Sequence, residues 1–448
     1  MKTMKASYAA DLCGGKLIGE DTLFCGVTRD NREVAGGEMF VAIRGENFDG
    51  HDFAASASEK GASVLLVSKE IDSVSASQIL VSDTVKAMGD IASGYIKTLS
   101  AKRLCITGSV GKTTTKEMCA AVLSAGFKTH KTAGNFNNNI GLPLTVFGMD
   151  ESHEAAVLEI GTNHFGEILP LALIANPDAA IITAIGESHL EAFGTKEGVL
   201  REKIEILRGL KEGGVAILNG DDPLLWGMRD KISHRVVWFG TENEECDVFA
   251  EILENGAYEA RFTVCGSDAE FMITCGGIHN IRDALAAISA GREFGMDDEA
   301  IAKGLSQFKN TGMRQDVFEH NGVTIIRDCY NANPDSMKAS LSLLSGMKAA
   351  GRKICVLGDM LELGENAGAL HENIGEVAAK CADKVFVTGN FAPCYLNGAG
   401  EKGLSFEDKE SLAKTLEKEI KAGDVLLVKG SCGTKMWQVI EYLQGERK

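Results

Sequence analysis

The 448-residue sequence lacks the features that mark several protein classes. No stretch reaches the roughly 18 uninterrupted apolar residues that a membrane-spanning helix needs, and the N-terminal segment has no apolar signal-peptide core. Basic residues are in the minority, 46 against 63 acidic ones, and the formal charge is −17. A protein that binds nucleic-acid phosphates usually carries a basic stripe. We therefore expect a cytoplasmic protein with neither a membrane nor a nucleic acid as partner.

A disulfide framework is also missing. The 12 cysteines are scattered, none of them forms a CxxC pair, and several, such as Cys105 and Cys355, lie in apolar runs. We interpret most of them as small buried apolar side chains in a reducing compartment. Internal repeats, low-complexity tracts and long linkers are absent as well. The chain length alone predicts two to four domains, each large enough to bury its own core.

What the sequence does contain is an alternation of strands and helices in three units, which predicts an α/β protein. Residues 1–85 form a small unit with strands at 39–43 and 63–67 and a helix at 53–60, and residues 86–100 predict a connecting helix. The second unit extends to residue 311. Its expected strands are 103–107, 155–160, 179–184 and 215–218, and its expected helices start at 113 and 167 and cover 196–210 and 280–294.

Parallel and antiparallel strands are both expected beyond the first unit. Alternating strands and helices predict a parallel sheet covered on both faces. Residues 246–275 instead alternate polar and apolar residues between turn signals, which predicts an antiparallel insertion. The third unit, 312–448, has expected strands at 323–328, 353–357, 384–387 and 425–428, again separated by helices. This pattern predicts a second, smaller doubly wound sheet.

The most informative motif is a short glycine-rich turn between a strand and a helix. The strand RLCIT leads into GSVGKTTTKEM, which is helical in character. Backbone N–H groups at a helix start bind phosphate. In such a loop Lys112 would reach the β- and γ-phosphates, and the Thr113 hydroxyl would bind Mg²⁺. The spacing is GxxGKT rather than GxxxxGKT, because Ile106 stands five residues before Gly111.

Acidic and imidazole groups follow two later strands. Glu159 ends the strand AAVLEI, and His189 follows the strand AAIITA, where a second metal ligand is expected in an open α/β sheet. Taken alone, Glu159 could be a solvated strand end and His189 a loop histidine with its own partner. Lys203 could be one more exposed helix lysine. The four asparagines of GNFNNNIGLP could form turns or offer carboxamides to a polar ligand.

Further polar residues cluster in the third unit and near its start. Asp328 ends a strand and is followed by Tyr330 and Asn331 in the run DCYNANPDSM, which is more than helix capping needs. Arg314 could reach back over a nucleotide or lie on the surface. In the second unit, Asn280 of GIHN could cap a helix or contact a base. The segment 29–53, rich in Gly, Asp, Asn and Arg, suits a sugar-nucleotide pocket and equally suits plain loops.

Together these motifs resemble one family. TGSVGKTTTKEM, GNFNNNIGLPL, LEIGTNHFGEI, YNANPDSM, VLGDMLELG and LVKGS occur in the order found in Mur ligases, and the likeness spans essentially the whole chain. It implies three domains: a small α/β UDP-substrate domain (1–85), a central phosphate-loop ATPase domain (86–311) and a C-terminal Rossmann-like domain (312–448). It also implies an ATP-dependent ligase that joins D-alanyl-D-alanine to UDP-MurNAc-tripeptide through an acyl phosphate, and that is a monomer.

The resemblance assigns roles by position. The phosphate loop would hold ATP through the residues Gly108, Ser109, Val110, Gly111, Lys112, Thr113 and Thr114. Asn280 and Asn331 would contact adenine and ribose, and Arg314 and Asp328 would act at the closed interface near the nucleotide. The Mg²⁺ ligands would be Thr113, Glu159, His189 and Lys203. Lys203 corresponds to a lysine that the family carbamoylates. Asn31, Arg32 and Asn139 correspond to positions near the substrate, the last close to the metals and phosphates.

Four positions depart from the family pattern: Asn31 where Ser or Thr is usual, Asp283 for Asn, Cys432 for Arg and Trp437 for Glu. They bear on the contacts to UDP and to the dipeptide rather than on phosphate chemistry. Three other hypotheses predict different products. A sister ligase would add a single amino acid and usually carries a DYAH-type segment where this chain has CYNANP. A nucleotide switch would need no amine acceptor, and a small-molecule kinase would release a phosphorylated product without a new amide.

Overall fold

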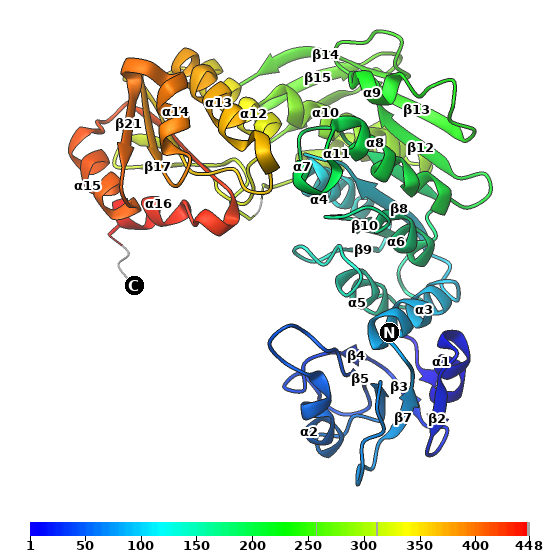
Figure 1. Ribbon diagram of the computed structural model, residues 1–448. Helices are drawn as coiled ribbons and strands as arrows, with labels where there is room; N and C mark the ends of the chain where they lie inside the picture. The colour runs from blue at the N-terminus through cyan, green and yellow to red at the C-terminus, as the bar shows by residue number, and fades with distance from the viewer. Residues whose placement is uncertain (257, 311, 446–448) are drawn as a thin grey trace.

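The computed structural model describes residues 1–256, 258–310 and 312–445. Three bodies follow one another along the chain in Figure 1: a blue N-terminal body, a cyan-to-green central body and a yellow-to-red C-terminal body. Each is built around one main sheet, of five, nine and six strands respectively. The mixed α/β class with parallel sheets expected from the sequence is confirmed.

The N-terminal body is a five-stranded sheet in the order β2-β7-β6-β5-β4. Its strands are β2 (Lys16–Ile18), β4 (Val27–Thr28), β5 (Met39–Val41), β6 (Val64–Val67) and β7 (Ser77–Leu80), and β1 (Met4–Lys5) pairs separately with β3 (Leu23–Phe24). The helices are α1 (Ala6–Cys13), α2 (Ala54–Glu59) and α3 (Thr84–Ile96). Asp83 caps α3 by accepting hydrogen bonds from the backbone N–H groups of Val85 and Lys86, which fixes where this helix begins.

The helix α3 joins the first two bodies. It packs against α1 on one side and against α5 and α6 on the other. Buried residues of the N-terminal sheet, such as Val64, belong to the same apolar core as Ile91 of α3 and Leu158 of the central sheet. The boundary expected between residues 85 and 86 therefore falls inside the first turn of a helix that both bodies share. The other expected boundary involves residue 311, which lies outside the described residues.

The central body holds a nine-stranded sheet in the order β16-β15-β14-β13-β12-β11-β8-β10-β9. The strands are β8 (Lys102–Thr107), β9 (Thr129–Lys131), β10 (Ala155–Glu159), β11 (Ala179–Ile182), β12 (Val215–Asn219), β13 (Arg235–Gly240), β14 (Val248–Asn255), β15 (Ala260–Val264) and β16 (Glu270–Ile273). The helices are α4 (Lys112–Ser124), α5 (Gly141–Phe147), α6 (Ile168–Ala175), α7 (Leu190–Phe193), α8 (Lys196–Lys203), α9 (Pro223–Trp226), α10 (Ile278–Glu293) and α11 (Asp298–Ser306).

Both faces of this sheet are buried. Leu104 and Ile106 of β8 belong to a core shared with α4 and α10, whereas Cys105 between them points to the opposite core shared with α3 and α6. Successive side chains of a strand alternate between faces, so a strand covered on both sides is apolar throughout. This explains why RLCIT has no polar alternation. The C-terminal ends of β8, β10 and β11 lie at one edge of the sheet, where a ligand crevice is expected.

The C-terminal body is a six-stranded sheet in the order β17-β18-β22-β19-β20-β21, parallel except for β17. Its strands are β17 (Asp316–His320), β18 (Val323–Asp328), β19 (Lys353–Leu357), β20 (Lys384–Thr388), β21 (Gly403–Phe406) and β22 (Val425–Lys429). The helices are α12 (Pro334–Gly346), α13 (Ala367–Cys381), α14 (Ala392–Ala399), α15 (Lys409–Glu419) and α16 (Trp437–Leu443). Apolar cores cover both faces.

One expectation about the central body needs correction. The helix expected over 196–210 is wrong in its second half, because α8 ends at Lys203 and Ile204–Gly209 is a 3-10 helix. The antiparallel strands expected within 246–275 are present, and the parallel pairing of β14 with β13 joins them to the main sheet. None of the described helices is long and apolar enough to cross a membrane.

Candidate active site

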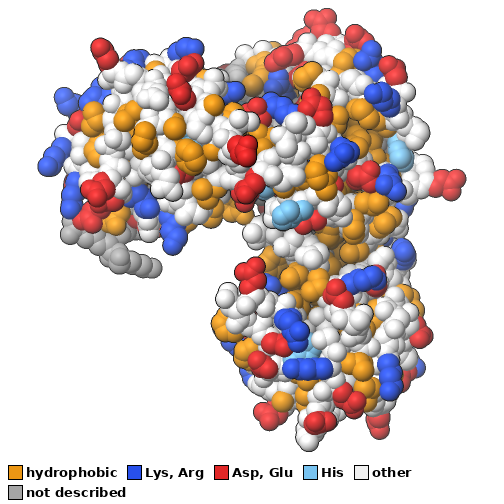
Figure 2. All heavy atoms as spheres, viewed as in Figure 1, with side chains coloured by type: hydrophobic (Ala, Val, Ile, Leu, Met, Phe, Trp, Pro, Cys, Tyr) orange, Lys and Arg blue, Asp and Glu red, His pale blue; other side chains and the backbone are white. Residues whose placement is uncertain are grey.

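One large cavity, of about 1460 Å³, is lined by residues of all three bodies. Figure 2 shows the concave side of the molecule, with the C-terminal and N-terminal bodies projecting on either side of the central one. Arg44 of the N-terminal body, the phosphate loop of the central body and Asp328 of the C-terminal body all face this space. Among the residues expected at the site, the cavity is lined by Ser109, Val110, Gly111, Lys112, Thr113, Thr114, Asn139, Glu159, His189, Asn280, Arg314, Asp328 and Asn331.

The phosphate loop runs between β8 and α4 and requires glycine at two places. Gly108 and Gly111 both have positive φ, 155° and 82°. A Cβ at Gly108 would lie 1.9 Å from Thr183 Oγ1, and one at Gly111 would lie 2.5 Å from Asp283 Oδ1. No other residue fits this turn without moving its neighbours. The loop therefore leaves the N-terminus of α4 open toward the cavity, which is the arrangement that binds phosphate.

Oxygen ligands gather at the start of α4. Thr113 Oγ1 donates a hydrogen bond of 2.9 Å to Glu159 Oε2 at the end of β10. The other carboxylate oxygen, Oε1, accepts one of 2.8 Å from Asn137 Nδ2. Asn137 was not singled out by the sequence, because four similar asparagines stand in one run. Its neighbour Asn138 instead accepts the backbone N–H of Gly141 at the start of α5, and Asn139 lines the cavity.

Two lysines expected at the site differ in position, since Lys112 lines the cavity and Lys203 does not. Lys112 Nζ donates to the carbonyl oxygen of Gly108 at 2.7 Å, and burial lowers its pKa, an effect that Glu159 partly offsets. Lys203, the last residue of α8, is 1% exposed. Burial lowers the pKa of Lys203 well below its ordinary value, and the Lys112 cation lowers it further, whereas Glu202 acts in the opposite direction. The sequence could not distinguish this lysine from an exposed one.

His189 stands at the start of α7 with a left-handed backbone, φ 53°. Its Nδ1 lies 2.6 Å from a carboxylate oxygen of Glu362, which belongs to the C-terminal body. Within the described residues no group of three or more His, Cys, Asp or Glu side chains forms a metal-binding cluster. The expected ligand set is of another kind, since it combines the Thr113 hydroxyl, the Glu159 carboxylate, the His189 imidazole and Lys203.

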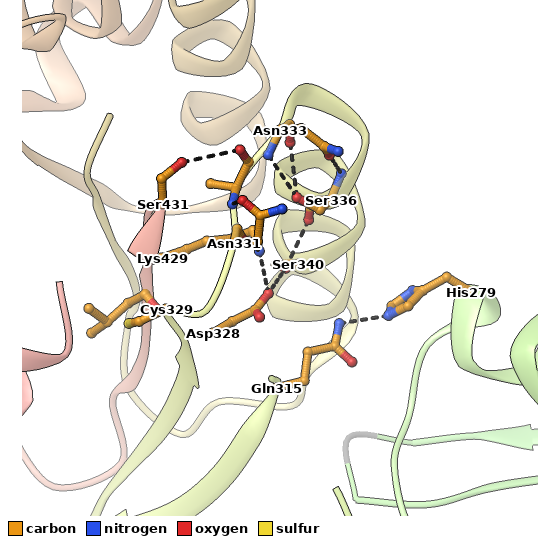
Figure 3. Close-up of polar contacts among 12 residues, drawn as sticks. His279, Gln315, Asp328, Cys329, Asn331, Asn333, Ser336, Ser340, Lys429 and Ser431 are labelled. Atoms are coloured by element: carbon orange, nitrogen blue, oxygen red, sulfur yellow. Dashed lines mark hydrogen bonds and ion pairs between the residues drawn. The ribbon is translucent and has the colours of Figure 1, made fainter. Parts of the chain in front are cut away.

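Another part of the cavity lies where the central and C-terminal bodies meet. Asn280 is buried in the first turn of α10, and its Nδ2 donates to Gln315 Oε1 at 2.7 Å. The Gln315 amide nitrogen also lies 2.6 Å from His279 Nε2, as Figure 3 shows. The Arg314 guanidinium stacks 3.9 Å above the centre of the Tyr330 ring. The sequence motifs pointed to Asn280 and Arg314 but gave no signal for Gln315.

A polar network fixes the end of β18. Lys429 Nζ, buried at the end of β22, donates to Asp328 Oδ2 at 2.6 Å and to the carbonyl oxygen of Asn331 at 3.1 Å. Ser340 of α12 donates to the same Asp328 oxygen at 2.6 Å (Figure 3). Asn333 caps α12 reciprocally with Ser336. Asp328 is thus held by two donors, and the loop that carries Asn331 is fixed relative to the strand.

Two expected substrate residues lie elsewhere. The Arg32 guanidinium is exposed and forms a bidentate pair with Asp30, and Asn31 Nδ2 donates to Ser56 Oγ at 3.3 Å. Neither residue lines the large cavity. The N-terminal body instead contributes Arg44, which lies in the same glycine- and arginine-rich segment and was not singled out.

Family models match all three bodies. The model described as Mur ligase middle domain matches residues 106–291, and the one described as Mur ligase, glutamate ligase domain matches residues 313–432. The model described as Mur ligase family, catalytic domain matches residues 24–96. The phosphate loop, the Glu159 and His189 positions and the Asp328 network all fall within these matched ranges.

Curated relatives match along nearly the whole chain. The UDP-N-acetylmuramoyl-tripeptide–D-alanyl-D-alanine ligase of Bacillus subtilis (strain 168) is 40% identical over 433 residues, 95% of this chain and 94% of the relative. The enzyme of the same name from Escherichia coli (strain K12) is 37% identical over 453 residues, 99% of each chain.

Solved structures agree with these matches. The crystal structure of MurF from Acinetobacter baumannii superposes with a TM-score of 0.92 at 32% identity, covering 99% of each chain. That of MurF from Thermotoga maritima in complex with ADP gives 0.84 at 31% identity, covering 94% of this chain and 97% of the other. Sequence, family models and three-dimensional structure thus agree, and the chain belongs to the Mur ligase family.

Proposed function

We propose that this chain joins D-alanyl-D-alanine to UDP-N-acetylmuramoyl-tripeptide with the cleavage of ATP, which gives UDP-MurNAc-pentapeptide, ADP and phosphate for peptidoglycan synthesis. The relatives that carry this activity in their names match at 37–40% identity over nearly the full length. The observation that carries the proposal is the large cavity, which brings the phosphate loop together with residues of both outer bodies. A ligase must hold a nucleotide, an acid and an amine at one point, and this cavity has room for all three.

ATP would bind with its phosphates on the loop from Gly108 to Thr114, close to Lys112. Its adenosine would lie toward Asn280 and Asn331, with Arg314 and Asp328 at the boundary between the central and C-terminal bodies. This placement is supported by the open N-terminus of α4 and by the position of these side chains along one cavity. We further propose the region 1–85 as the UDP-substrate domain, 86–311 as the ATP domain and 312–448 as the closing domain. Asn31, Arg32 and Asn139 would contact the UDP substrate.

Magnesium fits the donor groups near Thr113. The hydroxyl donates to Glu159, which leaves its lone pairs available, and hydroxyl, carboxylate and carboxamide oxygens are the ligands that Mg²⁺ prefers. The residues that would hold it are Thr113, Glu159, His189 and Lys203. Bound there, Mg²⁺ would neutralise charge on the triphosphate and on the acid substrate.

Lys203 would act as a carbamate. A neutral amine can attack CO₂, forming an N–C bond and releasing a proton, whereas an ammonium cannot. Burial lowers the pKa of this amine well below its ordinary value, which favours the neutral form, and the Lys112 cation would stabilise the resulting carbamate anion. The added carboxylate would provide another oxygen ligand for the metal.

The reaction would proceed in two transfers. First, a carboxylate oxygen of the tripeptide attacks the γ-phosphorus of ATP, the bond to the β-phosphate oxygen breaks and ADP leaves, giving an acyl phosphate. Then the dipeptide amine attacks the acyl carbon, the amide forms, and phosphate leaves with its electron pair as the amine loses a proton. Lys112 would stabilise the charge on the transferring phosphoryl group. Docking of the C-terminal body would keep water away from the acyl phosphate.

The test is phosphate release from ATP and Mg²⁺ with UDP-MurNAc-tripeptide, with and without D-alanyl-D-alanine, followed by mass spectrometry of the product. The expected result is dipeptide-dependent release and a product heavier by one dipeptide minus water. Substrates with lysine and with diaminopimelate at the third position are assayed in parallel. Release that ignores the dipeptide, or a product extended only by a single amino acid, would contradict the proposal. We place the enzyme in the cytosol as a monomer, in keeping with its 12 free cysteines.

A further inference from the structure

A contact between an imidazole and a carboxylate connects the central body to the C-terminal body beside the large cavity. His189, at the start of α7, lines the cavity, and its Nδ1 lies 2.6 Å from a carboxylate oxygen of Glu362. Glu362 lies in the loop that follows β19. The backbone carbonyl oxygen of the same residue accepts from Glu191 N at 3.5 Å, so the contact involves main chain as well as side chains.

The contact with Glu362 determines which ring nitrogen of His189 carries a proton and which has a lone pair. A carboxylate only accepts hydrogen bonds, so Nδ1 must carry the proton in a neutral ring, and the lone pair is then on Nε2. A histidine that binds a metal usually donates its other ring N–H to a carboxylate or carbonyl, which fixes both tautomer and orientation. His189 has such a partner, but on a different body of the protein.

The loop that carries Glu362 is held firmly by its own body. Met360 N donates to His371 Nε2, and Leu361 N donates to Ser431 Oγ, each at 3.0 Å. Asp359 accepts the backbone N–H groups of Asn390 and Phe391. Because the preceding residues are fixed on both sides, Glu362 is presented from a rigid platform and is not the end of a loose loop.

The approach of the two bodies at this point is close. Glu362 and Gly364 both have positive φ, 64° and 67°, which turns the chain back beside α7. A Cβ added at Gly364 would lie 3.3 Å from Glu191 Cα. The turn therefore lets the loop reach His189 without crowding the helix that follows it.

We propose that Glu362 is a positioning residue that orients His189 as a metal ligand, so that the metal site of the central body is complete only when the C-terminal body is docked. The inference rests on the proposed function to the extent that His189 is a ligand of the Mg²⁺ that accompanies ATP. It extends that function by assigning a role to a residue of the closing domain.

The same platform reaches the nucleotide side. Ser431 Oγ also lies 3.3 Å from the carbonyl oxygen of Ala332, in the loop that carries Asn331 (Figure 3). The end of β22 thus connects the loop beside the nucleotide with the loop that carries Glu362. Docking of the C-terminal body would form the contact to the nucleotide and orient His189 in a single movement.

The experiment measures Mn²⁺ in place of Mg²⁺ on the full-length protein with a non-hydrolysable ATP analogue, so that no turnover is involved. Mn²⁺ affinity is obtained by titration followed by electron paramagnetic resonance, and imidazole coordination by the electron spin echo modulation from nitrogen. Glu362→Ala is expected to weaken binding of the His-coordinated ion about 10- to 100-fold and to lose much of the imidazole modulation. Glu362→Gln keeps an acceptor oxygen and is expected to fall between wild type and the alanine variant.

Two comparisons make the result specific. Glu365→Ala removes an exposed carboxylate from the same loop and is expected to leave affinity and modulation unchanged. His189→Ala combined with Glu362→Ala is expected to lose no more than His189→Ala alone, because Glu362 acts through the histidine. Unchanged imidazole modulation in Glu362→Ala, additive losses in the double variant, or an equal loss in Glu365→Ala would overturn the inference. None of these readouts depends on amide formation, so they separate this proposal from the proposed ligase activity.

Discussion

Two lysines of the protein, Lys429 and Lys203, are equally buried but have opposite surroundings. Lys429, at the end of β22 in the C-terminal body, is 1% exposed and donates to Asp328 and to the Asn331 carbonyl oxygen. Lys203, at the end of α8 in the central body, is also 1% exposed, but there burial is the main influence on its pKa, which it lowers well below the ordinary value. Its main electrostatic neighbour is another cation, Lys112.

The difference in surroundings indicates a structural role for Lys429 and a chemical role for Lys203. A buried charge that is paired and hydrogen-bonded holds its surroundings in place, and removing one partner leaves the other uncompensated. Burial of an amine lowers its pKa and so favours the neutral form, which is a nucleophile that can react with CO₂. Burial alone therefore says little about the role of a lysine, whereas its partners say a great deal.

The largest expected effect is on stability, and it should fall on only one of the two lysines. Lys429→Met leaves Asp328 buried with Ser340 as its remaining donor, and is expected to cost about 3–5 kcal/mol. Lys203→Met replaces a desolvated amine with an apolar chain of similar length, and is expected to change stability by less than about 1.5 kcal/mol. Urea unfolding of both variants in CO₂-depleted buffer measures the difference. Equal losses would remove the distinction.

Activity is expected to distinguish the two lysines in the opposite direction to stability, with the specific loss at Lys203. Lys203→Ala should reduce dipeptide-dependent phosphate release by on the order of 10²-fold or more, since the variant cannot form the proposed carbamate. Added short-chain carboxylates should restore part of the rate by occupying the vacated space. Lys429→Ala is the matched control, because its partner is already a carboxylate and added acid has nothing to replace. Full activity of Lys203→Ala would refute the carbamate.

The features that could be predicted from the sequence are local ones, whereas those that could not depend on contacts between residues far apart in the chain. The strands at 323–328 and 353–357 were predicted to the residue, because a buried strand between turn signals is a local pattern. The phosphate loop was likewise predicted, since strand, glycines and helix are contiguous. The pairing of Lys429 with Asp328 joins residues 101 positions apart, and no local pattern encodes it.

The other features that the sequence did not reveal were missed for similar reasons. Glu362 and Gln315 act across the boundary between bodies, which only tertiary contact creates. Asn137 could not be distinguished from its neighbours because the run offers four similar side chains, and only the turn decides which one points at Glu159. The early end of α8 places Lys203 at a helix terminus, whereas apolar periodicity alone predicted seven more helical residues.

A smaller effect, on pH dependence, is expected at Asp283 beneath the phosphate loop. Burial raises its pKa from 3.8 to about 8, while the hydrogen bond from Thr115 lowers it. The folded state therefore holds this proton more tightly than the unfolded chain. Stability contributed by the protonated form is present below about pH 4 and is lost as the pH rises toward 8, by at most about 1.4 kcal/mol per pH unit. Asp283→Asn should flatten this decline.

The measurement is urea unfolding between pH 5 and 8, followed for wild type, Asp283→Asn and Asp11→Asn, a surface change that serves as control. Asparagine retains an acceptor for Thr115 and carries no charge, so it should match the protonated aspartic acid. If wild type and Asp283→Asn keep parallel profiles, the carboxyl is ionised throughout and the packing of Gly111 against it must tolerate a buried charge.

The smallest effect is expected far from the buried lysines, at Arg32 in the N-terminal body. Its guanidinium is exposed and paired with Asp30, so Arg32→Ala should leave the unfolding midpoint unchanged. If Arg32 contacts the UDP substrate, the KM for that substrate should rise by up to roughly tenfold, the loss of about one charge-assisted hydrogen bond, while the KM for ATP stays constant. Lys16→Ala, on an outer strand of the same sheet, is the control. An unchanged KM for the UDP substrate would instead favour Arg44, because that residue lines the cavity and Arg32 does not.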